Sequence, residues 1–419
     1  MKKLAFDTKL VHADRKINKP QFGAVHESTN NSVLFEFEDV QDLVDVFQGK
    51  KAGHVYSRSS SSSAVSLQNV LNELEGGVGA VVFATGMAAI SSTFLSLLKS
   101  GDHIVVSQYL FGNTRSFMAT IEGFGISVSF VDVTDVKNVQ DACNINTKMV
   151  FCETIANPVT QVSDLQGIGD FCESNNILFA LDNTMTPSVL LDANAVKASL
   201  LLTSLTKYIG GHGNVLGGVL VDTGLFNWET YTNIDYKYRV ADPQQWGLTQ
   251  VKKRGLRDMG ATLAPQSAHL VSVGLETLTM RLRKTCVNAQ ALAKYLSTHR
   301  GVDVVHYPGL EHHPQHIRAK TLFKRGFGGI LSVELSNDID PHAFLNALSL
   351  VISATHLGDT RTLALPAAST IFFENGANER AKMGIADSLI RISLGIEDIE
   401  DILADFDQAF ASVIENRRV

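Results

Sequence analysis

The sequence is most informative at Ser204-Leu205-Thr206-Lys207-Tyr208-Ile209-Gly210-Gly211-His212-Gly213, where one lysine lies between two hydroxyl side chains and a glycine-rich turn. This segment begins at the end of the apolar run 199–204, which is typical of a buried strand. Ligands of open α/β sheets bind beyond the carboxyl ends of the strands. The stretch therefore predicts a strand that carries a functional lysine at its end.

Six further apolar runs lie around this segment at the spacing of βαβ units. Several are apolar on both faces, as expected for a mostly parallel sheet covered by helices on each side. We therefore predict an α/β fold whose large domain, residues 61–255, is built on a seven-stranded sheet. The seven runs are 80–84, 103–107, 126–131, 148–153, 177–182, 199–204 and 215–222.

The rest of the chain has a different pattern. Residues 266–296 carry apolar side chains at helical spacing, which predicts a long connecting helix system. Further strands are expected at 330–335, 350–354 and 389–394, followed by an amphipathic helix at 398–410, so we predict a smaller α+β domain over 256–419. Residues 1–60 are polar with few periodic apolar positions, which predicts an irregular arm that contacts a neighbouring subunit.

Composition excludes several classes of protein. The 419 residues are 45% hydrophobic and 19% charged, which excludes a disordered or fibrous chain. The net charge of −7 comes without a basic stripe, so we expect no nucleic-acid partner. No apolar run reaches the length of a bilayer span, and the first residues lack the apolar core of an export signal. The four cysteines are widely spaced, which favours free thiols in the cytoplasm over a disulfide or zinc framework.

The lysine segment has the functions that one cofactor needs. Lysine forms a Schiff base with an aldehyde, and Ser204 and Thr206 lie on the same side of an extended chain, where both hydroxyls can bind a phosphate. Pyridoxal phosphate requires both a lysine for its aldehyde and polar groups that bind its phosphate. By itself, however, a Ser-x-Thr-Lys pattern is more often a solvated lysine after a strand, so other segments must decide.

Two other predicted strand ends fit the same cofactor. Asp182, at the end of the preceding run, can keep a pyridine nitrogen protonated, although a lone aspartate there is more often a helix cap or turn residue. At Ala84-Thr85-Gly86-Met87 the first strand turns into a helix, whose leading N–H groups suit a phosphate. Three such motifs in one sheet are far less probable by chance than any one of them, and together they predict pyridoxal phosphate.

With these motifs the sequence resembles the pyridoxal-phosphate enzymes of cysteine and methionine metabolism, which include cystathionine synthases and lyases, methionine γ-lyase and homoserine-ester sulfhydrylases. The resemblance covers nearly the whole chain and includes Tyr56-Ser57-Arg58, the segments 153–158 and 307–314, and 389–397. It implies the fold type I of pyridoxal-phosphate transferases. It also implies a homotetramer, built as a dimer of dimers, with active sites shared between subunits.

The resemblance implies residue roles as well. Lys207 matches the Schiff-base lysine and Asp182 the partner of the ring nitrogen. Arg391 would bind the substrate α-carboxylate in two hydrogen bonds, although an arginine on a strand beside a surface helix is the alternative. The other implied contacts are Gly86, Met87, Ser204 and Thr206 around the phosphate, Thr184 and Phe111 against the cofactor, Asn157 at the cofactor oxygen or the substrate carboxylate, and Tyr56 and Arg58 from the neighbouring subunit.

Three segments depart from the family pattern. Phe111 stands where many members have a tyrosine, so it can stack on the cofactor ring but has no hydroxyl to move a proton. Lys207 and Tyr56 remain as candidates for proton transfer. Residues 61–63 are serines instead of the usual Asn-Pro-Thr, which predicts a looser arm. Residues 354–356 lack the glutamate that some cystathionine enzymes have there.

These features predict a carbon–sulfur lyase that eliminates a sulfur leaving group from cystathionine or a related amino acid. The alternative is γ-replacement on an acylated homoserine, and an inactive oligomeric scaffold is a remote third possibility because the chain keeps Lys207, Asp182 and Arg391. No metal is expected. The histidines of 312–316 have no cysteine or acidic partners at ligand spacing.

Overall fold

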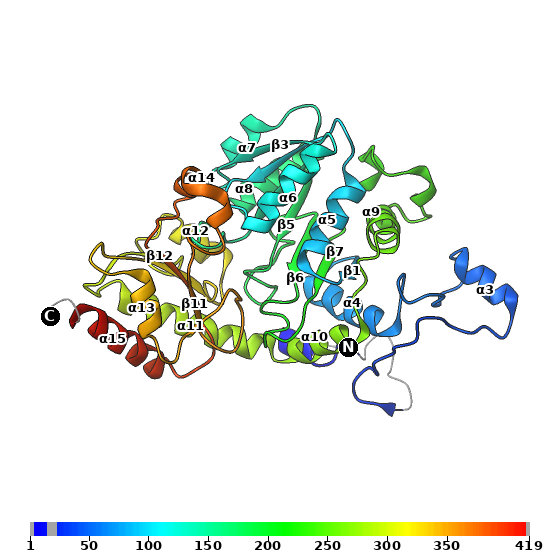
Figure 1. The fold of residues 1–419 in the computed structure, drawn as a ribbon. Coiled ribbons are helices and arrows are strands. Elements are labelled where there is room, and N and C mark those ends of the chain that lie inside the picture. The colour runs from blue at the N-terminus through cyan, green and yellow to red at the C-terminus, as the bar shows by residue number, and fades with distance from the viewer. Residues whose placement is uncertain (1–3, 15–22, 416–419) are drawn as a thin grey trace.

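A computed structural model describes residues 4–14 and 23–415 (Figure 1). Seven strands form its larger sheet, in the order β1-β7-β6-β5-β4-β2-β3, and each coincides with one predicted run. All neighbours pair in parallel except β7, which is antiparallel to β1 and β6. The predicted mostly parallel sheet is therefore confirmed. The strands are β1 (Gly79–Phe83), β2 (His103–Ser107), β3 (Ser127–Val131), β4 (Thr147–Glu153), β5 (Leu178–Asp182), β6 (Leu200–Ser204) and β7 (Gly218–Asp222).

Helices cover both faces of this sheet, which explains why its central strands are apolar throughout. Alternate residues of each strand point to opposite faces. On one face, Phe151 and its neighbours pack against α5 (Gly86–Leu97) and α6 (Gly112–Gly123). On the other, Phe179 belongs to a cluster with α4 (Ser62–Glu75) and α8 (Leu165–Ser174). α7 (Val136–Ala142) completes the layer beside β3.

The carboxyl ends of the parallel strands lie along one edge of the sheet. Glu153 and Asp182, the last residues of β4 and β5, are register partners. Gly218 pairs with Phe83 at the end of β1 and with Ser204 at the end of β6. Four strand ends are therefore neighbours at this edge.

Residues 223–262 lead from the sheet to the long helices in a series of short turns. They contain η2 (Trp228–Thr230), η3 (Tyr236–Tyr238), η4 (Pro243–Gln245), α9 (Trp246–Gln250) and η5 (Val251–Asp258). The predicted connecting helix system is two consecutive helices, α10 (Pro265–Glu276) and α11 (Leu278–Leu296).

A second, five-stranded sheet has the order β10-β11-β12-β9-β8, and it confirms the smaller α+β unit. Two of its strands were not predicted. β8 (Val302–His306) is an edge strand with exposed positions, and β11 (Leu363–Pro366) has only four residues. The predicted strand at 350–354 shortens to β10 (Ile352–Ser353). The remaining elements are β9 (Ile330–Leu335), β12 (Leu389–Ser393), α12 (His316–Leu322), α13 (Pro341–Ala347), η6 (Phe373–Asn375), α14 (Gly376–Lys382) and α15 (Ile399–Glu415).

The N-terminal segment is more regular than its sequence suggests. It contains α1 (Phe6–Leu10) and α3 (Val40–Phe47), so the expectation of an irregular arm is wrong for these residues. Leu10 is buried in the core of the larger sheet and thus packs on its own chain. By contrast, α3 lies away from the rest of the molecule (Figure 1), and Phe47 is 68% exposed. Residues 1–3 and 15–22 of the predicted arm lie outside the described residues.

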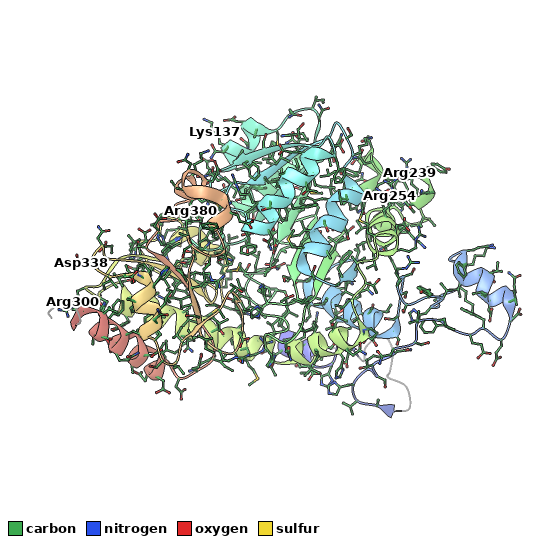
Figure 2. All side chains as sticks on the ribbon, viewed as in Figure 1. Lys137, Arg239, Arg254, Arg300, Asp338 and Arg380 are labelled. Carbon is green, nitrogen blue, oxygen red and sulfur yellow. The ribbon has the colours of Figure 1, made fainter. Side chains whose placement is uncertain are left out.

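The surface carries charged side chains such as Lys137, Arg239 and Arg300, which lie at the periphery (Figure 2). Arg391, in contrast, is only 1% exposed and lies on the central strand β12 of the second sheet. Within residues 4–14 and 23–415, no helix combines the length and the apolar character needed to cross a bilayer.

Candidate active site

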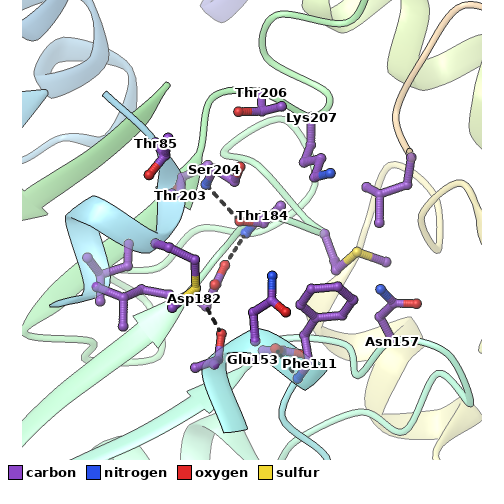
Figure 3. A pocket seen from close by; sticks show the side chains of 18 of the residues that line it. Thr85, Phe111, Glu153, Asn157, Asp182, Thr184, Thr203, Ser204, Thr206 and Lys207 are labelled. Atoms are coloured by element: carbon purple, nitrogen blue, oxygen red, sulfur yellow. Dashed lines mark hydrogen bonds between the residues drawn. The ribbon is translucent and has the colours of Figure 1, made fainter. Parts of the chain in front are cut away.

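The edge of the larger sheet opens into a cavity of about 290 Å³ (Figure 3). The ends of β1, β4, β5 and β6 form one side of it, and Thr355, Leu357 and Arg391 of the second sheet region line it as well. Every predicted site residue lines this cavity except Tyr56 and Arg58. Those present are Gly86, Met87, Phe111, Asn157, Asp182, Thr184, Ser204, Thr206, Lys207 and Arg391.

Lys207 lies in the turn that follows β6. Burial, together with the positive charge of Arg391, lowers the pKa of its ammonium group to about 8. Its Nζ lies 3.4 Å from Nδ1 of His356. A larger fraction of this amine than of an ordinary lysine is therefore unprotonated near neutral pH, which favours a nucleophilic or basic role.

Two carboxyl groups lie side by side at the sheet edge. Burial, and the facing carboxyl of Asp182, raise the pKa of Glu153 to about 8. Burial also raises the pKa of Asp182, so the two neighbouring carboxyl groups disfavour carrying two negative charges at once. Oε1 of Glu153 accepts a hydrogen bond from the N–H of Phe111 at 2.9 Å. Asp182 is held from the other side, because Thr184 N–H donates to its Oδ1 at 2.9 Å.

Thr184 also connects Asp182 to the lysine segment. Its Oγ1 accepts a hydrogen bond from the N–H of Ser204 at 2.8 Å, so the ends of β5 and β6 are joined through one side chain (Figure 3). The orientation of Asp182 is thereby fixed before any ligand binds.

The opposite corner of the cavity suits an anion. Gly86 is the first residue of α5, and a Cβ at this position would lie 2.8 Å from Cβ of Ser204, so only glycine fits. The side chain of Thr85 caps the helix by accepting from Ala88 N–H at 3.0 Å. Thr206 Oγ1 accepts from Gly217 N–H at 3.0 Å. Leading helix N–H groups beside hydroxyls are typical of a phosphate site.

Arg391 reaches the cavity from β12. Its guanidinium donates to the carbonyl oxygens of Thr355, at 3.1 Å, and His356, at 2.8 Å. Its Nε is buried and finds no partner among the described residues, and the same holds for Oδ1 of Asn157. Two unpaired polar atoms beside a cavity are expected to bind a polar ligand, since burying them unpaired is unfavourable.

Tyr56 and Arg58 lie elsewhere in their own chain. The Arg58 guanidinium is 5.5 Å from the centroid of the Tyr56 ring, and it donates to the carbonyl of Arg257. Thr262 Oγ1 donates to the Arg58 carbonyl at 2.7 Å. Their predicted role at a neighbouring subunit's cofactor stays a prediction.

Comparison with known proteins decides the family. Residues 7–411 match the family described as Cys/Met metabolism PLP-dependent enzyme. The chain belongs to this family. It is 34% identical over 416 residues to an L-methionine γ-lyase of Fusobacterium nucleatum subsp. polymorphum, covering 98% of this chain and 99% of that protein. It is 33% identical over 426 residues to an O-acetyl-L-homoserine sulfhydrylase of Corynebacterium glutamicum, with 97% of each chain covered.

Solved structures of the Cys/Met metabolism family share the fold. A Campylobacter jejuni protein described as an O-acetylhomoserine (thiol)-lyase superposes with a TM-score of 0.91 at 28% identity, covering 97% of this chain and 99% of that chain, and it contains N'-pyridoxyl-lysine-5'-monophosphate. Cystathionine γ-lyase of Lactobacillus plantarum gives a TM-score of 0.87 at 28% identity, with 98% and 99% covered. The predicted fold class and cofactor, pyridoxal phosphate, are thereby confirmed.

The cavity of this Cys/Met family member fits the cofactor. It combines an amine of lowered pKa, a fixed carboxyl group and an anion corner in one space. Lys207, Asp182 and the start of α5 would hold the aldehyde, the ring nitrogen and the phosphate, respectively.

Sequence reasoning missed several residues of the site. Thr85, Thr203 and Met185 line the cavity but were not assigned to it. Thr85 and Thr203 lie within the segments 84–87 and 199–204 that the sequence singled out, and Met185 directly follows Thr184. Glu153 could have been found, because it ends a predicted strand next to the one that ends at Asp182. His356 lies in the segment 354–356, which the sequence singled out only for its missing glutamate, and its contact with Lys207 joins residues 149 positions apart.

Proposed function

We propose that the chain is a pyridoxal-phosphate-dependent lyase that eliminates a sulfur leaving group from an amino acid with an uncharged side chain. The observation that carries this proposal is the set of charges in the cavity. The only ionisable side chains among its lining residues are Glu153, Asp182, Lys207 and Arg391.

None of these four groups remains to pair with a charge at the far end of a substrate side chain. Asp182 would hold the ring nitrogen of bound pyridoxal phosphate, Lys207 would hold its aldehyde and Arg391 would take the substrate α-carboxylate, while the raised pKa of Glu153 favours its neutral form. The distal ammonium and carboxylate of cystathionine would find no counter-charge among the described residues that line this cavity. A thioether such as that of methionine needs none.

The residues divide the chemistry between them. Bound pyridoxal phosphate supplies a conjugated ring that takes up electrons from the substrate α-carbon. Arg391 orients the α-carboxylate through its free Nε, and the neutral amine of Lys207 accepts the α-proton at Nζ. Phe111 lines the cavity and would cover a face of the bound ring and exclude water from it. With one water consumed, the net products are a thiol, a 2-oxo acid and ammonia.

The second candidate is γ-replacement, favoured by the 33% identity to an O-acetyl-L-homoserine sulfhydrylase. An acetyl ester is also uncharged, so the same cavity accommodates it. The steps up to loss of the α-proton use the same residues, and the two reactions differ in whether a thiol then adds.

Part of the proposed site comes from a second subunit. Tyr56 and Arg58 lie outside the cavity of their own chain, and α3 presents exposed apolar side chains such as Val40 and Phe47. Both features support a shared active site in a homotetramer, in which Tyr56 is a further candidate for proton transfer. The four cysteines are unpaired, which supports a cytoplasmic location.

The test is to incubate the purified holoenzyme with methionine, cysteine, cystathionine, and O-acetylhomoserine plus sulfide. A 2-oxo acid and a thiol formed from methionine in equal amounts would support elimination. Homocysteine formed from the ester and sulfide without 2-oxo acid would support replacement instead. Cystathionine as the best substrate would overturn the charge argument, and Lys207→Ala is the inactive control.

A further inference from the structure

We propose that Arg281 is a positioning residue, whose guanidinium fixes the backbone turn that carries Lys207 and thereby holds the amine in the cavity. The inference rests on the proposed function, in which one nitrogen must bind the aldehyde and also accept the α-proton. We call residues 205–211 the lysine turn. Arg281 belongs to α11 and is not among the described residues that line the cavity, so it acts on Lys207 through this turn.

The guanidinium pairs the backbone carbonyls that follow the lysine. Nη1 of Arg281 donates to the carbonyl oxygen of Tyr208 at 2.7 Å, and Nη2 donates to that of Ile209 at 3.1 Å. The next carbonyl, that of Gly210, accepts from Nδ1 of His212 at 2.7 Å. Three successive carbonyls of the lysine turn are therefore paired, two of them by one side chain.

The other donors of Arg281 hold the corner between α10 and α11. Nη2 also donates to the carbonyl of Gly274 at 2.6 Å, and Nε donates to Thr277 Oγ1 at 3.1 Å. A Cβ at Gly274 would overlap the carbonyl of Gly210, so α10 packs directly on the lysine turn. One planar side chain thus joins the helix corner to the turn.

Glycines let two neighbours approach the lysine turn closely. Gly211 has φ of +71°, and a Cβ there would overlap Nη1 of Arg281. Gly358 has φ of +75°, and a Cβ there would lie 2.7 Å from the amide nitrogen of Tyr208, so the loop that carries His356 also packs on the turn. The turn is therefore enclosed by packing, and Arg281 supplies the hydrogen bonds.

The guanidinium is a buried cation without a counter-charge. Arg281 is 8% exposed, and no carboxylate among the described residues forms an ion pair with it. Burial lowers its pKa to about 10, so the group stays positive at neutral pH. Carbonyl and hydroxyl dipoles offset the cost of burying this charge. A shift of the lysine turn would leave a buried cation short of acceptors, which opposes such a shift.

Loss of this side chain should reach the amine of Lys207. The carbonyls of Tyr208 and Ile209 would be buried without donors, so the turn would have to move or admit water. Burial is the main cause of the lowered pKa of Lys207, and a looser, wetter turn weakens that cause. The pKa of the Lys207 amine therefore reports on its position, whereas a purely structural role for Arg281 would leave this pKa unchanged.

Two substitutions and one control make the test. Arg281→Met removes the donors and the charge, whereas Arg281→Lys keeps the charge but lacks the planar fork that reaches four acceptors at once. Arg283→Met, at an arginine on the same helix whose side chain is 54% exposed, is the matched control. The first measurement is the pKa of the Lys207 amine in the cofactor-free protein, obtained from competitive acetylation across pH with mass-spectrometric analysis of the Lys207 peptide. Thermal unfolding and the kcat and KM of the holoenzyme complete the set.

We expect the midpoint of Lys207 labelling to rise by about one pH unit in Arg281→Met and by less in Arg281→Lys, because burial of the amine is partly lost. The midpoint in Arg283→Met should equal that of wild type. In the holoenzyme, Arg281→Met should lower kcat by about tenfold or more with KM little changed, since small displacements of a reacting group cost at least that much.

A wild-type midpoint or a wild-type kcat in Arg281→Met would overturn the proposal, even with a lowered unfolding temperature, because Arg281 would then only stabilise the fold. A wild-type midpoint in Arg281→Lys would also overturn it, since charge without the fork would suffice. If Arg281→Met does not fold, the Arg281→Lys midpoint decides. The labelling needs neither substrate nor cofactor, so a wild-type holoenzyme without turnover would count against the proposed function alone.

Discussion

The two ends of the cavity are built in different ways. At one end, the strand ends of a single sheet place Gly86, Glu153, Asp182 and Ser204 as neighbours. At the other end, Arg391 and the loop of residues 354–362 come from a separate sheet and reach the lysine only through tertiary packing.

The difference matters because Lys207 lies between the two ends. The sheet fixes where its backbone turns, while burial and then the positive charge of Arg391 from the second sheet lower its pKa. The sheet end therefore provides the geometry for the cofactor, and the other end contributes to the reactivity of the amine. Substitutions on either side of Lys207 test this division.

The largest effect is expected at Lys207, which lies between the two ends of the cavity. Lys207→Ala should abolish turnover and leave a folded protein, because the mutation removes only the reacting amine from a site fixed by backbone contacts. Turnover, circular dichroism and the visible absorption of the bound cofactor are the measurements. A variant that still shows a borohydride-reducible cofactor would prove the assignment of Lys207 wrong.

The same division explains what the sequence predicted. The site residues at the sheet end could be predicted because apolar runs locate the strands. The strands β5 and β6 end at the chemically informative residues Asp182 and Ser204. At the other end, Arg391 could be predicted only from the family resemblance. The contact of His356 with Lys207 depends on a glycine at positive φ and on packing between residues 149 positions apart, which no local pattern contains.

Removing the charge at the second end should change both binding and reactivity. Arg391→Leu should raise KM by about a hundredfold, because a buried charged hydrogen bond is worth about 2–5 kcal/mol when one partner is truncated. Because the positive charge disfavours the Lys207 ammonium, the midpoint for labelling of Lys207 should rise above about 8.

Two controls accompany this variant. Arg391→Lys keeps the charge and should leave that midpoint near its wild-type value, although it loses the planar fork. Arg300→Leu removes an exposed arginine and should change neither quantity. An unaltered midpoint in Arg391→Leu would mean that the two ends are not coupled.

A third source of site residues would extend the comparison to a second subunit. Arg58→Ala and Lys207→Ala should each be nearly inactive alone, yet mixed oligomers should recover about one quarter of the wild-type activity. Half of randomly mixed dimers are hybrids, and each hybrid has one intact site. Hybrid formation is verified by native mass spectrometry, and verified hybrids without activity would contradict the shared site.

The smallest effect is expected at Phe111, whose backbone belongs to the sheet end and whose ring contacts Phe372 edge-on at 6.2 Å, near the second sheet. If the ring stacks on the cofactor, Phe111→Tyr should bind pyridoxal phosphate about as well as wild type. Phe111→Ala should lose on the order of 1 kcal/mol of binding free energy, from lost stacking and burial. Equilibrium binding to the cofactor-free protein measures both, with the exposed Phe124→Ala as control.

The same pair of variants tests proton transfer separately from stacking. If Lys207 and Tyr56 already move the protons, the new hydroxyl of Phe111→Tyr should leave the pH profile of turnover nearly unchanged. If protonation of the leaving group limits the rate, that variant should be faster and gain an acidic limb. Undiminished cofactor binding in Phe111→Ala, or a tenfold loss in Phe111→Tyr, would show that the Phe111 ring does not stack on the cofactor.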